Sequence, residues 1–105
     1  MATPLNLRIT PAARRAITEF LASVEESNSI AALMLGRTND DPVDRWSIGA
    51  YYPENIRALT PIYEEKKLPL LYQCDGLVLA IPQNHLIPSL EGRTLDRTAQ
   101  EYVVV

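Results

Sequence analysis

The chain has 105 residues, the usual size of one domain and too few for two hydrophobic cores, so we expect residues 1–105 to form a single domain. Hydrophobic residues make up 47% and charged residues 22%, a globular composition that excludes an intrinsically disordered chain. The net charge of -3 excludes the positive field that attracts phosphate backbones, so we expect no nucleic-acid partner.

The first predicted elements are a strand and a capped helix. Apolar and polar side chains alternate over residues 5–9, which predicts a strand with one buried face. Thr10 can cap a helix whose first position is Pro11, because a proline there has no hydrogen bond to lose. Four apolar residues at helical spacing then form one stripe: Ala13, Ile17, Phe20 and Val24. We expect the helix to end at residues 27–29.

A hairpin is predicted next. The short apolar run at residues 30–35 is closed by Gly36, which predicts a strand buried on both faces. Turn-forming residues follow at positions 38–42. Beyond them a second strand is predicted, in which one face carries Trp46, Ile48, Ala50 and Tyr52.

Residues 53–67 carry conflicting signals. Pro53 and Pro61 break strand ladders, whereas Ile56 and Leu59 have helical spacing. We therefore expect a loop with one helical turn in this segment.

A second hairpin is predicted from residues 70–73 and 77–81. Asp75 and Gly76 lie between these two runs, and this dipeptide favours a tight turn with positive φ. Residues 82–89 then predict a short helical turn.

Toward the C-terminus, Gly92 is expected at a tight turn with positive φ, and residues 102–105 are predicted to form a strand. An apolar terminal strand invites pairing, so we expect it either to self-associate or to be buried within the fold. Together these elements predict an α+β fold, with one N-terminal amphipathic helix and a small β-rich domain of mixed and antiparallel strands.

Two parts of the chain resemble the A-type iron-sulfur carrier proteins, whose fold is called HesB-like. Residues 7–13 (Leu-Arg-Ile-Thr-Pro-Ala-Ala), running into Ile17 and Leu21, look like the family's first strand and capped helix. Residues 75–81 (Asp-Gly-Leu-Val-Leu-Ala-Ile) and 90–96 (Leu-Glu-Gly-Arg-Thr-Leu-Asp) are similar to its second hairpin and its Leu-x-Gly-x-x-apolar-Asp signature. The resemblance covers most of the chain and implies a HesB-like fold.

The cysteine ligands of that family are absent here. The carriers hold iron or a cluster with three cysteines, one in a Gly-Cys-Ser-Gly loop after the second strand and two in a Cys-Gly-Cys near the C-terminus. Residues 36–41 of this chain are Gly-Arg-Thr-Asn-Asp-Asp, and no cysteine follows Cys74. The resemblance therefore implies an inherited fold without its thiolate site, and we expect no bound cofactor.

Cys74 and His85 are the side chains that could carry chemistry, and each has two interpretations. Cys74 could be a reactive thiol or a lone ligand, but a small residue at a strand end is more often packed in the core. His85 could bind a metal, yet it has no cysteine or histidine at a fixed spacing. We therefore assign no catalytic, cofactor-binding or metal-binding residue.

Two charged stretches also have a functional and a structural interpretation. Asn39, Asp40, Asp41 and Asp44 could offer oxygens to a hard cation, but they lack the ligand spacing of an EF-hand, so a solvated hairpin loop is favoured. Residues 64–67 (Glu-Glu-Lys-Lys) indicate a charge cluster that faces water.

The sequence indicates a cytoplasmic protein without a membrane partner. The apolar runs at residues 30–35 and 77–81 are much shorter than the roughly 20 residues needed to cross a bilayer. No charged and apolar leader opens the chain. Cys74 alone cannot form an intramolecular disulfide, which fits a reducing compartment.

Two classes of function remain open. We expect a non-enzymatic binding or interaction protein, as a homodimer or with another protein, because the tyrosines and Trp46 are amphipathic aromatics that interfaces favour, although core packing explains many of them equally well. The alternative is a divergent iron-sulfur cluster assembly or iron-binding accessory protein, in which Cys74 or His85 supplies one ligand and a partner chain the rest. We expect no enzymatic activity, because the single histidine has no recognisable catalytic partner.

Overall fold

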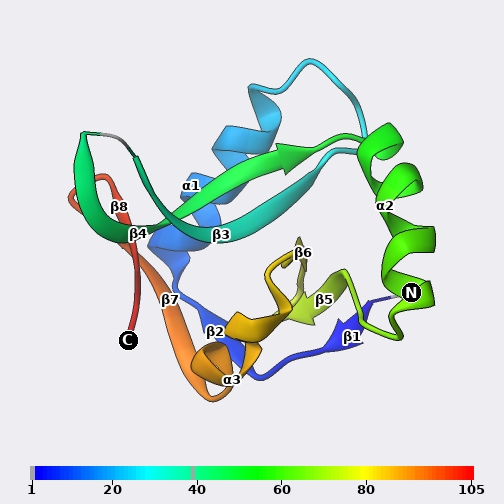
Figure 1. The fold of residues 1–105 in the computed structure, drawn as a ribbon. Helices are drawn as coiled ribbons and strands as arrows, with labels where there is room; N and C mark the ends of the chain where they lie inside the picture. Colours follow the sequence, from blue (N-terminus) through cyan, green and yellow to red (C-terminus); the bar gives the residue numbers. More distant parts are fainter. Residues whose placement is uncertain (1, 39) are drawn as a thin grey trace.

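The strands that the structure describes form one mixed sheet (Figure 1). The structure is a computed structural model, and it describes residues 2–38 and 40–105. In these residues the strands are β1 (Thr3–Pro4), β2 (Leu7–Ile9), β3 (Ile30–Thr38), β4 (Asp41–Tyr51), β5 (Leu71–Cys74), β6 (Leu77–Ala80), β7 (Arg93–Thr98) and β8 (Glu101–Val104). Their order across the sheet is β1-β5-β6-β3-β4-β8-β7-β2. The helices are α1 (Pro11–Ala22), α2 (Pro53–Glu65), the 3₁₀ turn η1 (Asn84–Leu86) and α3 (Ile87–Leu90), so the chain is α+β.

The N-terminal stretch joins the two ends of this sheet. β1 pairs in parallel with β5 and β2 pairs in parallel with β7, although only Leu5 and Asn6 separate β1 from β2. The Leu5 N–H donates to the carbonyl of Gln73 (3.0 Å), and the Asn6 carbonyl accepts from the N–H of Gly92 (2.7 Å). The sheet is therefore curled, because one short stretch of chain borders both of its ends.

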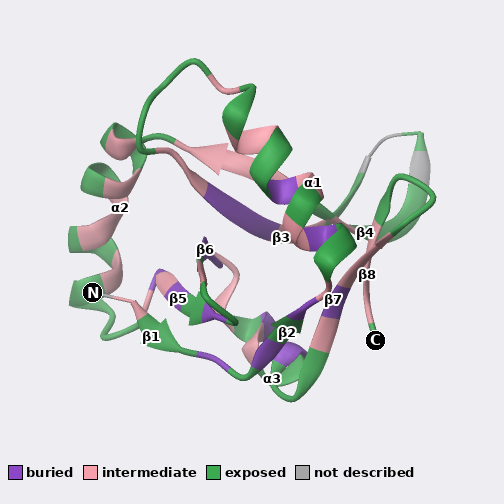
Figure 2. Cartoon of the chain, turned by 180° about the vertical axis from the view of Figure 1, so that it is seen from behind, coloured by how far each residue is buried: buried purple, intermediate pink, exposed green. Residues whose placement is uncertain are grey.

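The alternation predicted at residues 5–9 is confirmed (Figure 2), because Leu5, Leu7 and Ile9 are buried and the polar residues between them are exposed. These three side chains belong to the main core, which the sheet and α1 enclose. The other buried members of the main core are Ala13, Ile17, Ala31, Leu33, Tyr72, Cys74, Leu79, Ile81, Leu90 and Leu95.

α1 begins as predicted and ends early. The Thr10 hydroxyl accepts from the N–H of Ala13 (3.2 Å), and Pro11 occupies the first helical position. The expected end at residues 27–29 was wrong, because the helix stops at Ala22. Ser23 follows as the C-cap, and its hydroxyl donates to the carbonyl of Phe20 (2.6 Å), which satisfies one of the acceptors at the end of the helix.

The first predicted hairpin is confirmed and is longer than expected. β3 and β4 pair in antiparallel register from Ile30↔Tyr51 onward, with an irregularity between Gly36 and Thr38. The turn predicted at residues 38–42 includes Asn39, which lies outside the described residues. Tyr52 was expected in the second strand, which was wrong, because β4 ends at Tyr51 and Tyr52 is the exposed residue that precedes α2.

The segment predicted as a loop with one helical turn is instead a helix of 13 residues, α2. Pro53 occupies its first position, where a missing N–H costs nothing, and the N–H of Tyr52 donates to the side chain of Asn55 (2.8 Å). Pro61 lies inside the helix and removes one backbone hydrogen bond. This unfavourable effect of an internal proline is the reason why a loop was predicted for the segment. The expectation of a single N-terminal helix is therefore corrected.

Tertiary packing stabilises α2 in spite of Pro61. Ile56, Leu59 and Tyr63 pack against a second, smaller core cluster of Ala32, Leu70 and Ala80. The Tyr63 hydroxyl also donates to the carbonyl of Pro82 (2.7 Å). In the part of the chain that the structure describes, no helix combines the length and the apolar character needed to span a bilayer.

Two tight turns close the remaining hairpins. Asp75 (φ 49°) and Gly76 (φ 83°) join β5 to β6, which confirms the predicted second hairpin. Ala99 (φ 46°) and Gln100 (φ 67°) join β7 to β8 in the same left-handed conformation, and the sequence did not predict this hairpin. The short helical turn expected at residues 82–89 is present as η1 and α3.

The terminal strand lies inside the sheet. β8 pairs with β7 along its whole length on one side and with β4 on the other side, where Trp46↔Tyr102 is the register pair. Of the two expected outcomes for residues 102–105, the structure therefore shows incorporation into the fold.

A side-chain amide continues the edge of β3 beyond β6. β6 pairs with β3 only at Ala31↔Leu79 and Ala32↔Ala80. Farther along β3, the N–H of Leu35 donates to Oε1 of Gln83 and Nε2 of Gln83 donates to the carbonyl of Leu35, both at 2.9 Å. The side chain of Gln83 therefore forms with the backbone of Leu35 the two hydrogen bonds that a neighbouring strand would otherwise form.

Removal of the Gln83 amide should destabilise the fold. Gln83→Ala leaves the partly buried N–H and carbonyl of Leu35 without protein partners, so we expect a loss of about 1–2 kcal/mol in the free energy of unfolding. Urea unfolding followed by circular dichroism measures this loss. The control is Gln73→Ala, whose side chain is exposed, and it should change stability by no more than about 0.5 kcal/mol. Equal losses in the two variants would show that the bridge contributes nothing.

The backbone of Gly92 provides a second test. Its φ of 78° confirms the predicted left-handed turn, and an added Cβ would meet no atom within 4 Å. Gly36 has the same open surroundings without a positive φ. We therefore expect Gly92→Ala to cost about 1 kcal/mol or more and Gly36→Ala to cost much less. Thermal and urea unfolding of both variants separate backbone strain from steric clash, and equal stability of the two would exclude strain at Gly92.

Candidate functional site

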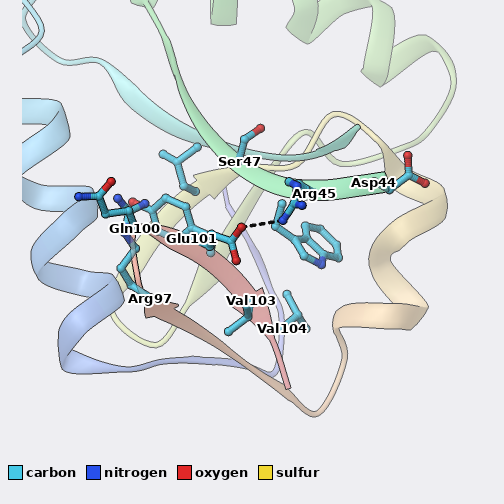
Figure 3. A pocket seen from close by; sticks show the side chains of 11 residues that line it. Asp44, Arg45, Ser47, Arg97, Gln100, Glu101, Val103 and Val104 are labelled. Atoms are coloured by element: carbon cyan, nitrogen blue, oxygen red, sulfur yellow. Dashed lines mark hydrogen bonds and ion pairs between the residues drawn. The ribbon is translucent and has the colours of Figure 1, made fainter. Parts of the chain in front are cut away.

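A hollow of about 700 Å³ lies between β4 and β8 (Figure 3), and we call it the β4–β8 hollow. The two strands share the single register pair Trp46↔Tyr102, whereas β3 and β4 are paired along nearly their whole length. The β4–β8 hollow therefore opens where the sheet has its shortest ladder. Its lining residues are Asp44, Arg45, Trp46, Ser47, Ile48, Arg97, Gln100, Glu101, Tyr102, Val103 and Val104.

Ion pairs engage three of the charged side chains in this lining. Figure 3 shows Arg45 of β4 facing Glu101 of β8, and Nη1 of Arg45 lies 2.6 Å from Oε1 of Glu101. Asp44 forms a second pair with Arg37 of β3, with 3.1 Å between Oδ1 and Nε. Both pairs are half exposed and contribute little to stability, so their main effect is to fix side-chain positions at the opening.

Arg97 has a different environment. Its guanidinium carbon lies 4.5 Å from the centroid of the Tyr102 ring, which is a cation–π contact. Burial raises the pKa of Tyr102, and the neighbouring Arg97 opposes that rise. No ion pair joins Arg97 to a carboxylate in the part of the chain that the structure describes.

A second hollow of about 370 Å³ adjoins the first on the side of α1. Both are lined by Ile48, Arg97 and Tyr102, and the second adds Ala16, Glu19 and Phe20 of α1. The guanidinium of Arg97 therefore lies at the junction of the two hollows.

Cys74 is fully buried in the main core at the end of β5. Burial raises the pKa of the Cys74 thiol to about 11, and the carboxylates of Asp75 and Glu91 add to the rise. At about pH 7 almost none of this thiol is the thiolate that attacks electrophiles or binds metals. Its position therefore favours the structural interpretation of the sequence.

His85 lies in η1 and is exposed. Among the described residues, no group of three or more histidine, cysteine, aspartate or glutamate side chains is arranged to hold a metal ion. Neither Cys74 nor His85 lines the β4–β8 hollow.

The charged stretches singled out from the sequence are exposed where the structure describes them. Asp40 is exposed in the hairpin turn and Asp44 pairs with Arg37, whereas the suggestion for Asn39 and for the side chain of Asp41 lies outside the part that the structure describes. Residues 64–67 at the end of α2 are exposed, which confirms the water-facing cluster.

The tyrosines and Trp46 fall into four groups. Trp46 and Tyr102 line the β4–β8 hollow and also pack against the main core, Tyr51 and Tyr63 pack on the smaller core cluster, Tyr72 is buried in the main core, and Tyr52 is exposed. Arg45, Arg97 and Glu101 could not be singled out from the sequence, because single charged residues on separate strands form no motif. Only the pairing of β4 with β8 brings them together.

Comparison with protein-family models, with curated proteins and with solved structures gives no match for this chain.

The environment of Cys74 predicts slow chemical modification. At about pH 8 only on the order of one thiol in a thousand is ionised when the pKa is near 11, so iodoacetamide should label the folded protein at least about 100-fold more slowly than the urea-unfolded chain. The control is Gln73→Cys combined with Cys74→Ala, because position 73 is exposed on the same strand and should label rapidly.

The same pKa shift makes stability depend on pH. The folded-state pKa of Cys74 lies above the unfolded value of 9.0, so the stability that it contributes is complete below about pH 9 and is lost as the pH rises toward 11. The free energy of unfolding should therefore fall more steeply over this range in the natural sequence than in Cys74→Ala. Rapid labelling of the folded protein, or equal slopes, would contradict a buried neutral thiol.

Proposed function

We propose that the chain is a non-enzymatic binding protein on a HesB-like scaffold, and that its ligand site is the β4–β8 hollow. One observation carries the proposal: aromatic and apolar side chains together with strand-borne arginines line a hollow of about 700 Å³ where the sheet has its shortest ladder. Concave sites with apolar walls and a few fixed polar groups are typical of ligand binding.

The order of the elements supports the scaffold. The segment that resembles the first strand and capped helix of the A-type carriers forms β2 and α1. The segment with Asp75 and Gly76 forms the β5–β6 hairpin, and the signature around Gly92 forms the turn into β7. α2 is the element that the resemblance did not lead us to expect.

The lining supports binding more than catalysis. Arg45, Glu101 and Asp44 form ion pairs, so these charged side chains already have partners. Ser47 supplies a hydroxyl, but the chain's single histidine, His85, is not part of the lining and cannot serve there as its base. Trp46 and Tyr102 instead offer large aromatic surfaces for apolar contact with a ligand.

The experiment uses Trp46, the only tryptophan of the chain, as its probe. A library of small organic molecules is screened by ¹H–¹⁵N spectroscopy, and we expect binders to shift the Trp46 indole resonance together with the amides of β8. Ser47→Phe should weaken this binding by filling the β4–β8 hollow, whereas Thr98→Phe, at an exposed position outside the lining, should not. Shifts confined to residues outside the lining, or no binder at all, would reject this site.

Two further measurements bear on the other expectations. Light scattering of the purified protein tests the expected homodimer. Anaerobic incubation with iron and sulfide tests the alternative, an iron-sulfur or iron accessory protein. We expect no stable cluster, because the thiol of Cys74 is buried and protonated. Stoichiometric iron and sulfide that survive desalting and are lost in Cys74→Ser would replace the proposal by that alternative.

A further inference from the structure

The charges around the β4–β8 hollow leave one cation without a carboxylate partner. The two carboxylates in the lining each already contact an arginine, since Glu101 pairs with Arg45 and Asp44 pairs with Arg37. Arg97 is the remaining charged side chain of the lining, and it forms no ion pair in the described part of the chain. A ligand that enters the hollow therefore meets one available positive charge.

Two other carboxylates, those of Asp96 and Glu19, could neutralise Arg97, but neither forms an ion pair with it. The carboxylate of Asp96 accepts the hydroxyl of Thr10 at 2.6 Å and the backbone N–H of Arg97 at 2.8 Å, and these bonds hold the pKa of Asp96 below its usual value. Glu19 of α1 lines the second hollow together with Arg97 but forms no ion pair with it. The negative charge of Glu19 therefore repels an anion that approaches Arg97, but the Glu19 carboxylate does not itself pair with the guanidinium.

The geometry of Arg97 suits a carboxylate. The guanidinium carbon of Arg97 lies over the Tyr102 ring at 4.5 Å from its centroid, and this contact restricts the side chain before a ligand arrives, which lowers the entropy cost of binding. A guanidinium is a planar fork of N–H donors that matches the two oxygens of a carboxylate. An anion in this position would lie beside an aromatic ring and not in open water.

Part of the wall around this charge is apolar and aromatic. Trp46 and Ile48 of β4 and Val103 and Val104 of β8 are in the lining, and three of them, Trp46, Ile48 and Val104, also pack against the main core. Aromatic rings favour flat ligands, because offset stacking adds to the burial of apolar area. The lining therefore suits a flat apolar body that carries one negative charge.

We propose that the β4–β8 hollow binds a small aromatic monocarboxylate, with Arg97 as the anchor for the carboxylate and Trp46 as part of the wall for the ring. This inference rests on the proposed function and adds the chemical class of the ligand.

The probes are 2-naphthoate and its neutral analogue 2-naphthamide, titrated into the ¹⁵N-labelled protein. We expect 2-naphthoate to shift the Trp46 indole and to bind at least about tenfold more tightly than 2-naphthamide, because a charge-assisted bidentate pair is lost in the amide. Arg97→Met should remove most of this preference, and Arg97→Lys should restore part of it by returning the charge without the fork.

Two other variants separate Arg97 from the general field of the protein. Arg93→Met removes an exposed arginine of the same strand that is not in the lining, and it should leave the affinity for 2-naphthoate unchanged. Glu19→Gln should strengthen 2-naphthoate binding by a few-fold, because it removes a negative charge that repels the carboxylate of the probe. Native-like amide dispersion and unchanged unfolding midpoints establish that the variants are folded.

Each outcome has a defined meaning. If 2-naphthamide binds in the hollow as tightly as 2-naphthoate, or if Arg93→Met costs as much as Arg97→Met, the carboxylate inference fails while the proposed ligand site stands. If neither probe shifts Trp46 but other molecules do, the ligand class is wrong and the site is retained. If no molecule shifts Trp46, both proposals fail. Tighter binding of a short peptide ending in phenylalanine than of 2-naphthoate would support the carboxylate anchor and identify a chain terminus as its source.

Discussion

The fold depends on the way in which its first ten residues are held by the last third of the chain. β2 lies against β7, and the N–H of Ile9 donates to the carboxylate of Asp75 at 3.0 Å in the β5–β6 turn. The hydroxyl of Thr10 donates to Asp96 at 2.6 Å, so the residue that caps α1 is also bonded to β7. Arg14 of α1 pairs with Asp75 at 3.4 Å. One set of contacts thus closes the sheet, starts α1 and fixes its position over the core.

The proposed ligand site follows from this closure. β7 lies between β2 and β8, so the edge of β8 that is free of β7 borders β4, and these two strands share the single register pair Trp46↔Tyr102. A longer ladder would bring Val104 and Asp44 together and leave no room between the strands. The weakest part of the sheet is therefore also the part that offers side chains to a ligand, while the well-paired hairpin of β3 and β4 supports it.

The sequence predicted those elements whose signals are local. The alternation at residues 5–9, the Thr10 cap and the turns at Gly76 and Gly92 each depend on neighbouring residues, and each was found as expected. α2 was missed because Pro61 opposed a helix in spite of the helical spacing of Ile56 and Leu59, and the tertiary packing on Ala32 and Leu70 that favours this helix cannot be predicted from local preferences. The β7–β8 hairpin was missed because Ala99 and Gln100 are poor indicators of a turn with positive φ. The candidate site could not be predicted from the sequence for a related reason. Arg45 and Glu101 are distant in sequence, and they come into contact only when β4 and β8 are paired.

The parallel pairing of β2 with β7 also orders events during folding. A nascent chain cannot complete this sheet while residues 93–98 are still inside the ribosome, although the β3–β4 hairpin and α1 are already available. The apolar side chains of residues 5–9 therefore lack their β7 neighbour until residues 93–98 have been synthesised. Such long-range parallel pairing is slow because the entropy of closing the intervening loop is lost before the strands gain any contact. The stretch that closes the native sheet is thus also the one whose pairing has to await a segment far away in the sequence.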